Sequence, residues 1–132
     1  MTAVERYFFT PLYHPRSNWS VVSWWESRRL MFNLCVGSAG LLSLATTILI
    51  ARLPPHPFPM GIPWIGVLVY GVMANLCYTL GPLTDLVLRR LLGNRAPAVG
   101  PVLFRYGFVF AMGLTLLPIP VAAVGWLLRW FI

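Results

Sequence analysis

The residues best suited to chemistry at membrane depth recur every three or four positions in the middle of the chain. They are Gly71, Asn75, Tyr78, Pro82, Asp85 and Arg89, with Thr79 beside them. On a helix this spacing places them on one face. Polar groups are costly inside a bilayer, so this polar face of the second helix is expected to point toward protein or a cavity rather than lipid.

Two roles fit this face. It can line a path for a proton, an ion or a small ligand, or it can hold helices together by hydrogen bonds. Packing is favoured, because a path needs several ionisable groups and Asp85 stands near the end of the apolar run. Asn75 and Thr79 would then bond to a neighbouring helix, and Asp85 would pair with Arg89 at the i, i+4 spacing.

Side-chain ligation of a metal or haem is not expected. His14 and His56 are the two histidines of the chain and lie outside the apolar runs, while Cys35 and Cys77 lie inside separate runs. Metal sites need such ligands to cluster, and no catalytic base stands near a serine or tyrosine nucleophile. The sequence therefore predicts a protein that is not an enzyme and ligates no cofactor. Bound lipids, neighbouring pigments or a quinone would contact its apolar faces.

A stripe of small residues marks the first apolar run. Cys35, Ala39, Ser43 and Thr47 are each four positions apart. Small side chains allow helix backbones to approach closely. This packing stripe predicts a helix contact, whose partner is the second helix, the third helix or another chain.

The composition requires a membrane for these helices. The chain has 132 residues, of which 58% are hydrophobic and 10% charged, whereas soluble domains carry about 25% charged residues. Apolar runs cover residues 30–51, 62–84 and 103–128. Each suffices to cross a hydrocarbon core of about 30 Å at about 1.5 Å per residue. The fold class predicted is therefore an all-α integral membrane protein with three transmembrane helices.

The ends of these helices follow from local signals. Ser23 and Glu26 fit a capping box, so the first helix, and with it a transmembrane domain over 24–132, is expected to begin there. The aromatics and prolines of residues 1–23 predict an interfacial strap instead of a helix. The second helix is expected to continue past Pro82, and the third to kink or break at Pro118 and Pro120. Interfacial anchors are predicted from the aromatic belt and flanking cations. These anchors are Trp19, Trp24, Trp25, Arg28, Arg29, Trp126 and Trp130.

The arginines predict an orientation. The net charge is +7, and every basic residue is an arginine at or near the end of an apolar run, which argues against nucleic-acid binding. Arg52 and Arg129 lie on one side of the predicted spans. On the other side lie Arg6, Arg16, Arg28, Arg29, Arg89, Arg90, Arg95 and Arg105. The positive-inside rule places that richer side, and with it the N-terminus, in the cytoplasm.

Three segments also carry a resemblance. The residues from Trp25 to Leu30 with Asn33, those from Asn75 to Gly81 followed by Asp85, and those from Gly100 to Phe104 resemble a group of small uncharacterised bacterial inner-membrane proteins. The likeness extends over about residues 24–117 and implies three or four helices in a bacterial cytoplasmic membrane. It implies nothing about chemistry.

These features together predict a non-catalytic accessory subunit of a larger bacterial membrane complex. Respiratory and photosynthetic assemblies are the hosts that suit such a subunit, with other membrane subunits and lipid as its partners. The alternative is a small homo-oligomeric transporter or channel that uses the polar face of the second helix. A membrane enzyme ranks third, because it would need an active-site base that the sequence does not offer, and only a cofactor bound next to Tyr78 or Asp85 would favour it.

Overall fold

The computed structural model describes residues 2, 5–6, 17–93 and 99–131, and this part of the chain contains helices and no strand. The helices are α2 (Asn18–Ala51), α3 (Trp64–Leu92), α4 (Gly100–Leu116) and α5 (Pro118–Leu128). Three helical segments are long and apolar enough to cross a membrane: α2, α3, and α4 with α5 taken together. The predicted all-α architecture with three transmembrane helices is confirmed.

The start of α2 differs from the prediction. Ser17 is the N-cap, because its side chain accepts a hydrogen bond of 3.0 Å from the backbone N–H of Ser20. Ser23 and Glu26, the predicted capping box, lie inside the helix. The sequence between Ser17 and Ser23 contains no proline or glycine, so nothing interrupts a helix capped six residues earlier. Most of the predicted strap lies outside the described residues, and its last part belongs to α2.

The third crossing is interrupted where the prolines predicted it. Leu117 separates α4 from α5, and Pro118 and Pro120 lack the backbone N–H groups that would continue the hydrogen-bond ladder. Leu117 nevertheless keeps helical dihedral angles (φ −54°, ψ −36°), and the N–H of Val121 still bonds to its carbonyl at 3.4 Å. The chain therefore continues as one crossing from Gly100 to Leu128.

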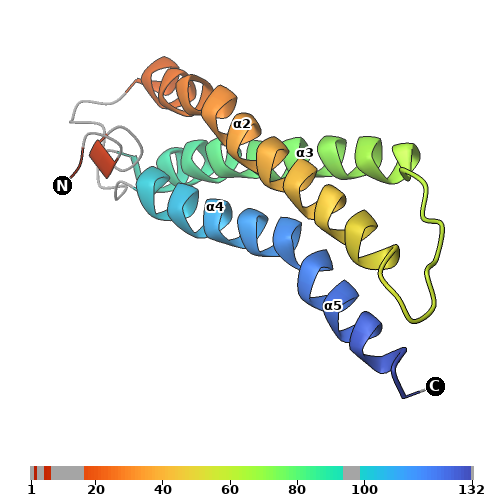
Figure 1. Cartoon of the computed structure of the whole chain (residues 1–132). Helices are drawn as coiled ribbons and strands as arrows, with labels where there is room; N and C mark the ends of the chain where they lie inside the picture. Colours follow the sequence, from red (N-terminus) through yellow and green to blue (C-terminus); the bar gives the residue numbers. More distant parts are fainter. Residues whose placement is uncertain (1, 3–4, 7–16, 94–98, 132) are drawn as a thin grey trace.

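Helix α2 is the element on which the others assemble. It contacts α3, α4 and α5, while α3 also contacts α4. Figure 1 shows α3 running antiparallel to α2 and diverging from it toward the loop of residues 52–63, where α5 instead accompanies the second half of α2. The packing is consequently tightest at the end of the bundle where α2 and α4 begin.

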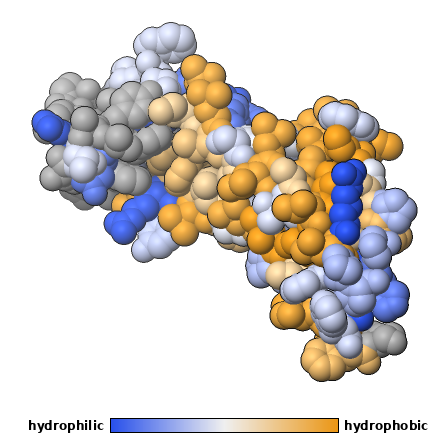
Figure 2. Space-filling model, viewed as in Figure 1, coloured by the Kyte–Doolittle hydropathy of each residue, from blue (hydrophilic) through white to orange (hydrophobic). Residues whose placement is uncertain are grey.

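Burial follows this arrangement. The buried face of α2 repeats at intervals of three and four residues through Val21, Trp25, Arg28, Phe32, Val36, Ala39 and Ser43. In α3 the buried residues are Tyr78, Pro82 and Asp85, all in its second half. Most other apolar side chains are exposed, and Figure 2 shows them covering the middle of the molecule, with hydrophilic residues toward its ends. An apolar waist of this kind suits lipid.

Candidate functional site

The centre of the tightly packed end is Trp25, whose side chain is 2% exposed. Its ring lies against Gly81 of α3, where a Cβ atom would fall 2.4 Å from Cη2 of the indole. No other residue type fits at Gly81 without moving this ring, because real Cβ contacts are never that short. Its indole Nε1 donates to Oδ2 of Asp85 at 3.4 Å. Trp25 thus joins α2 to α3 through both shape and a polar bond.

Aromatic rings surround Trp25 on three sides. Tyr78 meets it edge-on, with ring centroids 5.6 Å apart, and the Tyr78 hydroxyl donates to the Trp25 carbonyl oxygen at 2.6 Å. Trp24 meets it edge-on at 5.3 Å and Phe104 of α4 lies 6.0 Å away. Phe32 packs on Tyr78 at 4.7 Å. Edge-on pairs of this kind contribute beyond the area that they bury. We call Trp24, Trp25, Phe32, Tyr78, Asp85 and Phe104 the aromatic cluster.

Asp85 is the one acid of the cluster and is 6% exposed. Its Oδ2 lies against the first residue of α4, since a Cβ atom on Gly100 would fall 2.9 Å from it. Helix α4 has no side-chain cap of its own. The start of a helix carries a partial positive charge, so the carboxylate lies where a negative charge stabilises α4. Asp85 therefore contacts α2 through Trp25 and α4 through Gly100.

The predicted ion pair between Asp85 and Arg89 is wrong. Within the described residues Asp85 accepts from Trp25, and Arg89 carries a buried Nη1 atom without a hydrogen-bond partner. The i, i+4 spacing allows such a pair but does not require it. Here the burial of Asp85 against a helix 60 positions earlier decides the contact.

Two arginines border the cluster on α2. Arg28 is 7% exposed, donates to the Trp24 carbonyl at 3.0 Å and lies 4.0 Å above the Trp24 ring. Arg29 pairs with Glu26 at 2.9 Å, donates to Oγ1 of Thr79 at 3.4 Å, and lies 5.2 Å from the Tyr78 ring centre. A cation over an aromatic face is attracted by its negative charge density.

Three of the residues predicted to be interfacial anchors are instead buried inside the bundle. Trp24 and Trp25 are core residues of the cluster, and Arg28 is buried beside them, so none of the three faces lipid. They lie on the face of α2 that packs against α3 and α4, and the glycines at 81 and 100 make room for the rings. Trp19 and Trp130 are exposed as expected of anchors, and Arg29 is half-buried.

The polar face of α3 is divided. Tyr78, Pro82 and Asp85 are buried, and the first and last of these belong to the cluster, whereas Gly71 and Thr79 are exposed. Asn75 is half-buried, donates to the Gly71 carbonyl at 3.1 Å, and accepts from Nδ2 of Asn33 at 3.3 Å. The face therefore supplies contacts to α2 along two successive turns, at Thr79 and at Asn75.

The packing stripe of α2 faces the third crossing. Ala39 and Ser43 are buried, and Cys35 and Thr47 are half-buried. A Cβ atom on Gly40 would lie 3.7 Å from Cγ2 of Thr115, which places α4 next to the stripe. The sequence left its partner open, and the structure identifies the third crossing, since α2 contacts both α4 and α5. Thr115 itself bonds to the hydroxyl of Tyr70, so this residue joins all three crossings.

At the opposite end, the last turn of α5 holds the loop of residues 52–63. The Nε1 atom of Trp126 donates to the Pro54 carbonyl at 2.8 Å. Arg129 donates to the carbonyls of Ala51 at 3.3 Å and His56 at 2.9 Å. We call Trp126, Arg129 and these three carbonyls the loop clasp. Trp126 thus fixes a loop by a side-chain bond, in addition to any role at an interface.

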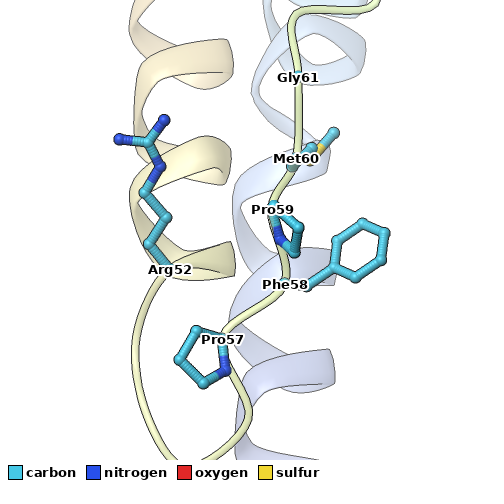
Figure 3. Close-up of a pocket in the computed structure, with 6 residues that line it drawn as sticks. All are labelled: Arg52, Pro57, Phe58, Pro59, Met60 and Gly61. Carbon is cyan, nitrogen blue, oxygen red and sulfur yellow. The ribbon is translucent and has the colours of Figure 1, made fainter.

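A hollow of about 560 Å³ lies beside this loop, lined by Arg52 and residues 57–61. Figure 3 shows the side chains of Arg52 and Phe58 pointing to opposite sides of the loop rather than toward a common point. Ligand sites bring a few polar groups together within an apolar cavity. This hollow lacks that convergence, and the described residues hold no group of three His, Cys, Asp or Glu side chains fit for a metal ion.

Sequence patterns alone missed Gly81 and Gly100 as contact residues, and missed Phe32, Phe104 and Thr115. The three segments that carried the family resemblance nonetheless converge in the aromatic cluster, through Trp25, Tyr78, Asp85 and Gly100. Comparison with known proteins adds no relative: no family model, no curated protein and no solved structure matches the chain.

Proposed function

We propose that this chain is a non-catalytic accessory subunit of a larger membrane complex in a bacterial cytoplasmic membrane. Its work is to hold helices in place and to present apolar faces to neighbouring subunits, lipids, pigments or a quinone. The observation that carries the proposal is that polar side chains of the predicted spans form hydrogen bonds between helices of this chain. Asp85, Tyr78 and Thr115 are bound to other helices of the same chain, so they serve packing rather than an open path.

A second observation supports a partner. The first half of α3 contributes no buried residue. Apart from Tyr70, which is half-buried and bonded to Thr115, most of its apolar side chains are exposed, among them Trp64, Ile65, Leu68 and Val72. An apolar face in a membrane is covered by lipid or by another helix, and helix contacts add packing that lipid does not. This half of α3 is therefore the face that we assign to the host complex.

Isolation in mild detergent from its native membrane tests the proposal. We expect the chain to purify with at least one other polypeptide in fixed ratio. A photo-crosslinking residue at Leu68 or Val72 should capture that polypeptide, while one at the buried Phe104 should not. A chain that purifies without any other polypeptide in every mild detergent tried would refute the accessory-subunit proposal.

The alternative, a homo-oligomeric transporter or channel, is favoured by one detail. Asn75, Thr79 and Gly71 keep part of their surface open on α3. The two functions differ in the response to Asn75→Ala. Under transport, this variant loses flux and keeps its assembly. Under the subunit proposal, it weakens association with the host and moves no solute.

The proposed orientation has its own test. In intact spheroplasts, a cysteine introduced at the exposed His56 should react with a membrane-impermeant thiol reagent, and one at Arg95 should not. The reverse pattern would overturn the cytoplasmic placement of the N-terminus.

A further inference from the structure

One arginine of the bundle stands beside side chains that suit lipid. Arg105 of α4 is exposed, and so are its neighbours Val102, Tyr106 and Val109. On a helix these three neighbours lie on the side opposite Phe104, the buried residue through which α4 joins the aromatic cluster. We call Val102, Tyr106 and Val109 the outer side of α4. Arg105 borders this outer side.

The packing of α4 against α2 sets the depth of Arg105. Phe104 meets Trp24 with ring centroids 6.2 Å apart, and one turn later Phe108 meets Phe32 at 6.2 Å. Arg105 therefore lies level with the part of α2 between these two rings, where the apolar run of that helix begins. The start of an apolar run marks the edge of the hydrocarbon core, where phospholipid headgroups meet their acyl chains.

No acidic side chain of the chain balances Arg105. The chain has three acids. Glu5 accepts from a backbone N–H near the start of the chain, and Glu26 pairs with Arg29. Asp85, the third, is buried in the aromatic cluster. Within the described residues, the Arg105 side chain has no hydrogen bond, ion pair or ring contact.

The helix does not stabilise this cation either. Cations are stabilised at the C-terminal end of a helix, whereas Arg105 lies in the first half of α4. Arg89 and Arg90 differ in this respect, because they occupy the last turn of α3. An anion from outside the chain is therefore the group that would balance Arg105 at this depth.

We infer that Arg105 binds the phosphate of an anionic phospholipid, such as phosphatidylglycerol, in the leaflet where α2 and α4 begin. A guanidinium donates two parallel N–H bonds to phosphate oxygens. The acyl chains then run deeper into the membrane along the outer side of α4, past Val109 and the exposed Phe110 and Leu117.

Two features commit the site to an anionic lipid. A cation at headgroup depth stands beside an exposed apolar wall, and a phospholipid complements both, whereas free phosphate or a nucleic acid leaves the wall uncovered. A zwitterionic lipid carries a cation of its own beside the phosphate. The chain has a net charge of +7, so a lipid with net negative charge balances it better.

The inference does not rest on the accessory role, and its test uses the full chain in phosphatidylcholine vesicles. A bimane label at Val109→Cys, in a background with Cys35→Ala and Cys77→Ala, is quenched by brominated acyl chains that lie beside it. Brominated phosphatidylglycerol should quench it more than brominated phosphatidylcholine does. Arg105→Gln should lower the relative affinity for phosphatidylglycerol by about fivefold, and Arg105→Lys, which keeps the charge, should retain most of it.

Two controls distinguish a site from general attraction of anionic lipid to a basic protein. Arg52→Gln removes the same charge at the opposite end of the bundle and should leave the preference at Val109 unchanged. A label at Leu68→Cys, exposed on α3, should show no preference. Equal quenching by the two lipids at Val109, an equal preference at Leu68, or an unchanged preference in folded Arg105→Gln overturns the inference.

Two further arms separate the other occupants. Glycerol phosphate in solution should not reduce the quenching at Val109, and competition by it would show a site for free phosphate instead. A photo-crosslinking residue at Val109 that captures a polypeptide in the native membrane would place a protein on this side of α4 and overturn the lipid site. Capture at Leu68 alone, with the lipid preference intact at Val109, supports both the lipid site and the accessory role.

Discussion

The two halves of α3 are built from similar apolar residues, yet they have different surroundings. The second half buries Tyr78, Pro82 and Asp85, whereas the first half, from Trp64 onward, contributes no buried residue and contacts the third crossing through the half-buried Tyr70. In a membrane, lipid tails are as apolar as leucine, so apolar side chains alone do not draw helices together. The difference teaches that polar bonds, ring geometry and glycine contacts select which half of α3 is held.

The largest effect should come from Trp25→Ala. This change opens a cavity among Trp24, Tyr78 and Phe104 and removes the donor to Asp85, so we expect a loss of about 3–5 kcal/mol in the free energy of unfolding. The measurement is an SDS titration in mixed micelles followed by circular dichroism. Trp64→Ala is the matched control in the first half of α3, where the side chain is 67% exposed. Similar losses for the two variants would refute the contrast between the halves.

A single methyl group should distinguish the halves as well. Gly81→Ala places a Cβ atom into the Trp25 ring and should cost about 1–3 kcal/mol of unfolding free energy in the same titration. Gly71→Ala, ten positions earlier on the same helix, meets no atom within 4 Å and should change stability by less than about 0.5 kcal/mol. If Gly81→Ala matched Gly71→Ala, Trp25 would not lie against Gly81.

Asp85 should stabilise the fold through its side-chain oxygens, which accept a hydrogen bond from Trp25. Asp85→Ala leaves the Trp25 indole N–H buried without a partner and removes a negative charge from the start of α4, at an expected cost of about 1–2 kcal/mol. Asp85→Asn retains a side-chain oxygen and should recover part of that loss. An Asp85→Ala protein as stable as the wild type would show that the indole bond contributes nothing. Chemical-shift changes of the Trp25 indole proton report the bond directly.

The smallest effect should appear at the opposite end of the molecule. Trp126→Phe removes one bond of the loop clasp, to the Pro54 carbonyl, and should cost about 0.5–1.5 kcal/mol. Hydrogen exchange should rise at the amides of residues 52–53 and 56 and stay unchanged around Tyr78. Trp130→Phe is the control, since Trp130 is exposed and makes a ring contact with Trp126 rather than a loop bond. Equal exchange in the two variants would contradict the clasp.

The crossings themselves were predictable, because run length and charge content alone decide whether a helix can cross a bilayer. The interruption at Pro118 was predictable as well, because proline lacks the backbone N–H that a continuous helix needs. The start of α2 was not predictable from the capping pattern. Three serines, at positions 17, 20 and 23, could each cap the helix. The structure shows Ser17 as the cap, because its side-chain oxygen accepts from the backbone N–H of Ser20.

The cluster shows what sequence patterns lack. The aromatic-belt rule recognises Trp25 as a membrane residue but does not distinguish a ring that faces lipid from one that faces Gly81. Likewise, helical spacing identified Asp85 as part of a polar face, yet its bond runs to a residue 60 positions away. Such contacts depend on how two helices are rotated against each other, and that rotation is a property of the packed bundle.

The loop clasp has a consequence for the order of events during synthesis. Its acceptors on Ala51, Pro54 and His56 leave the ribosome some seventy residues before its donors on Trp126 and Arg129. While the hairpin of α2 and α3 is entering the bilayer, the loop has no clasp. Only insertion of α5 delivers the two donors, so the connection between α2 and α3 is fixed after both of these helices have been made.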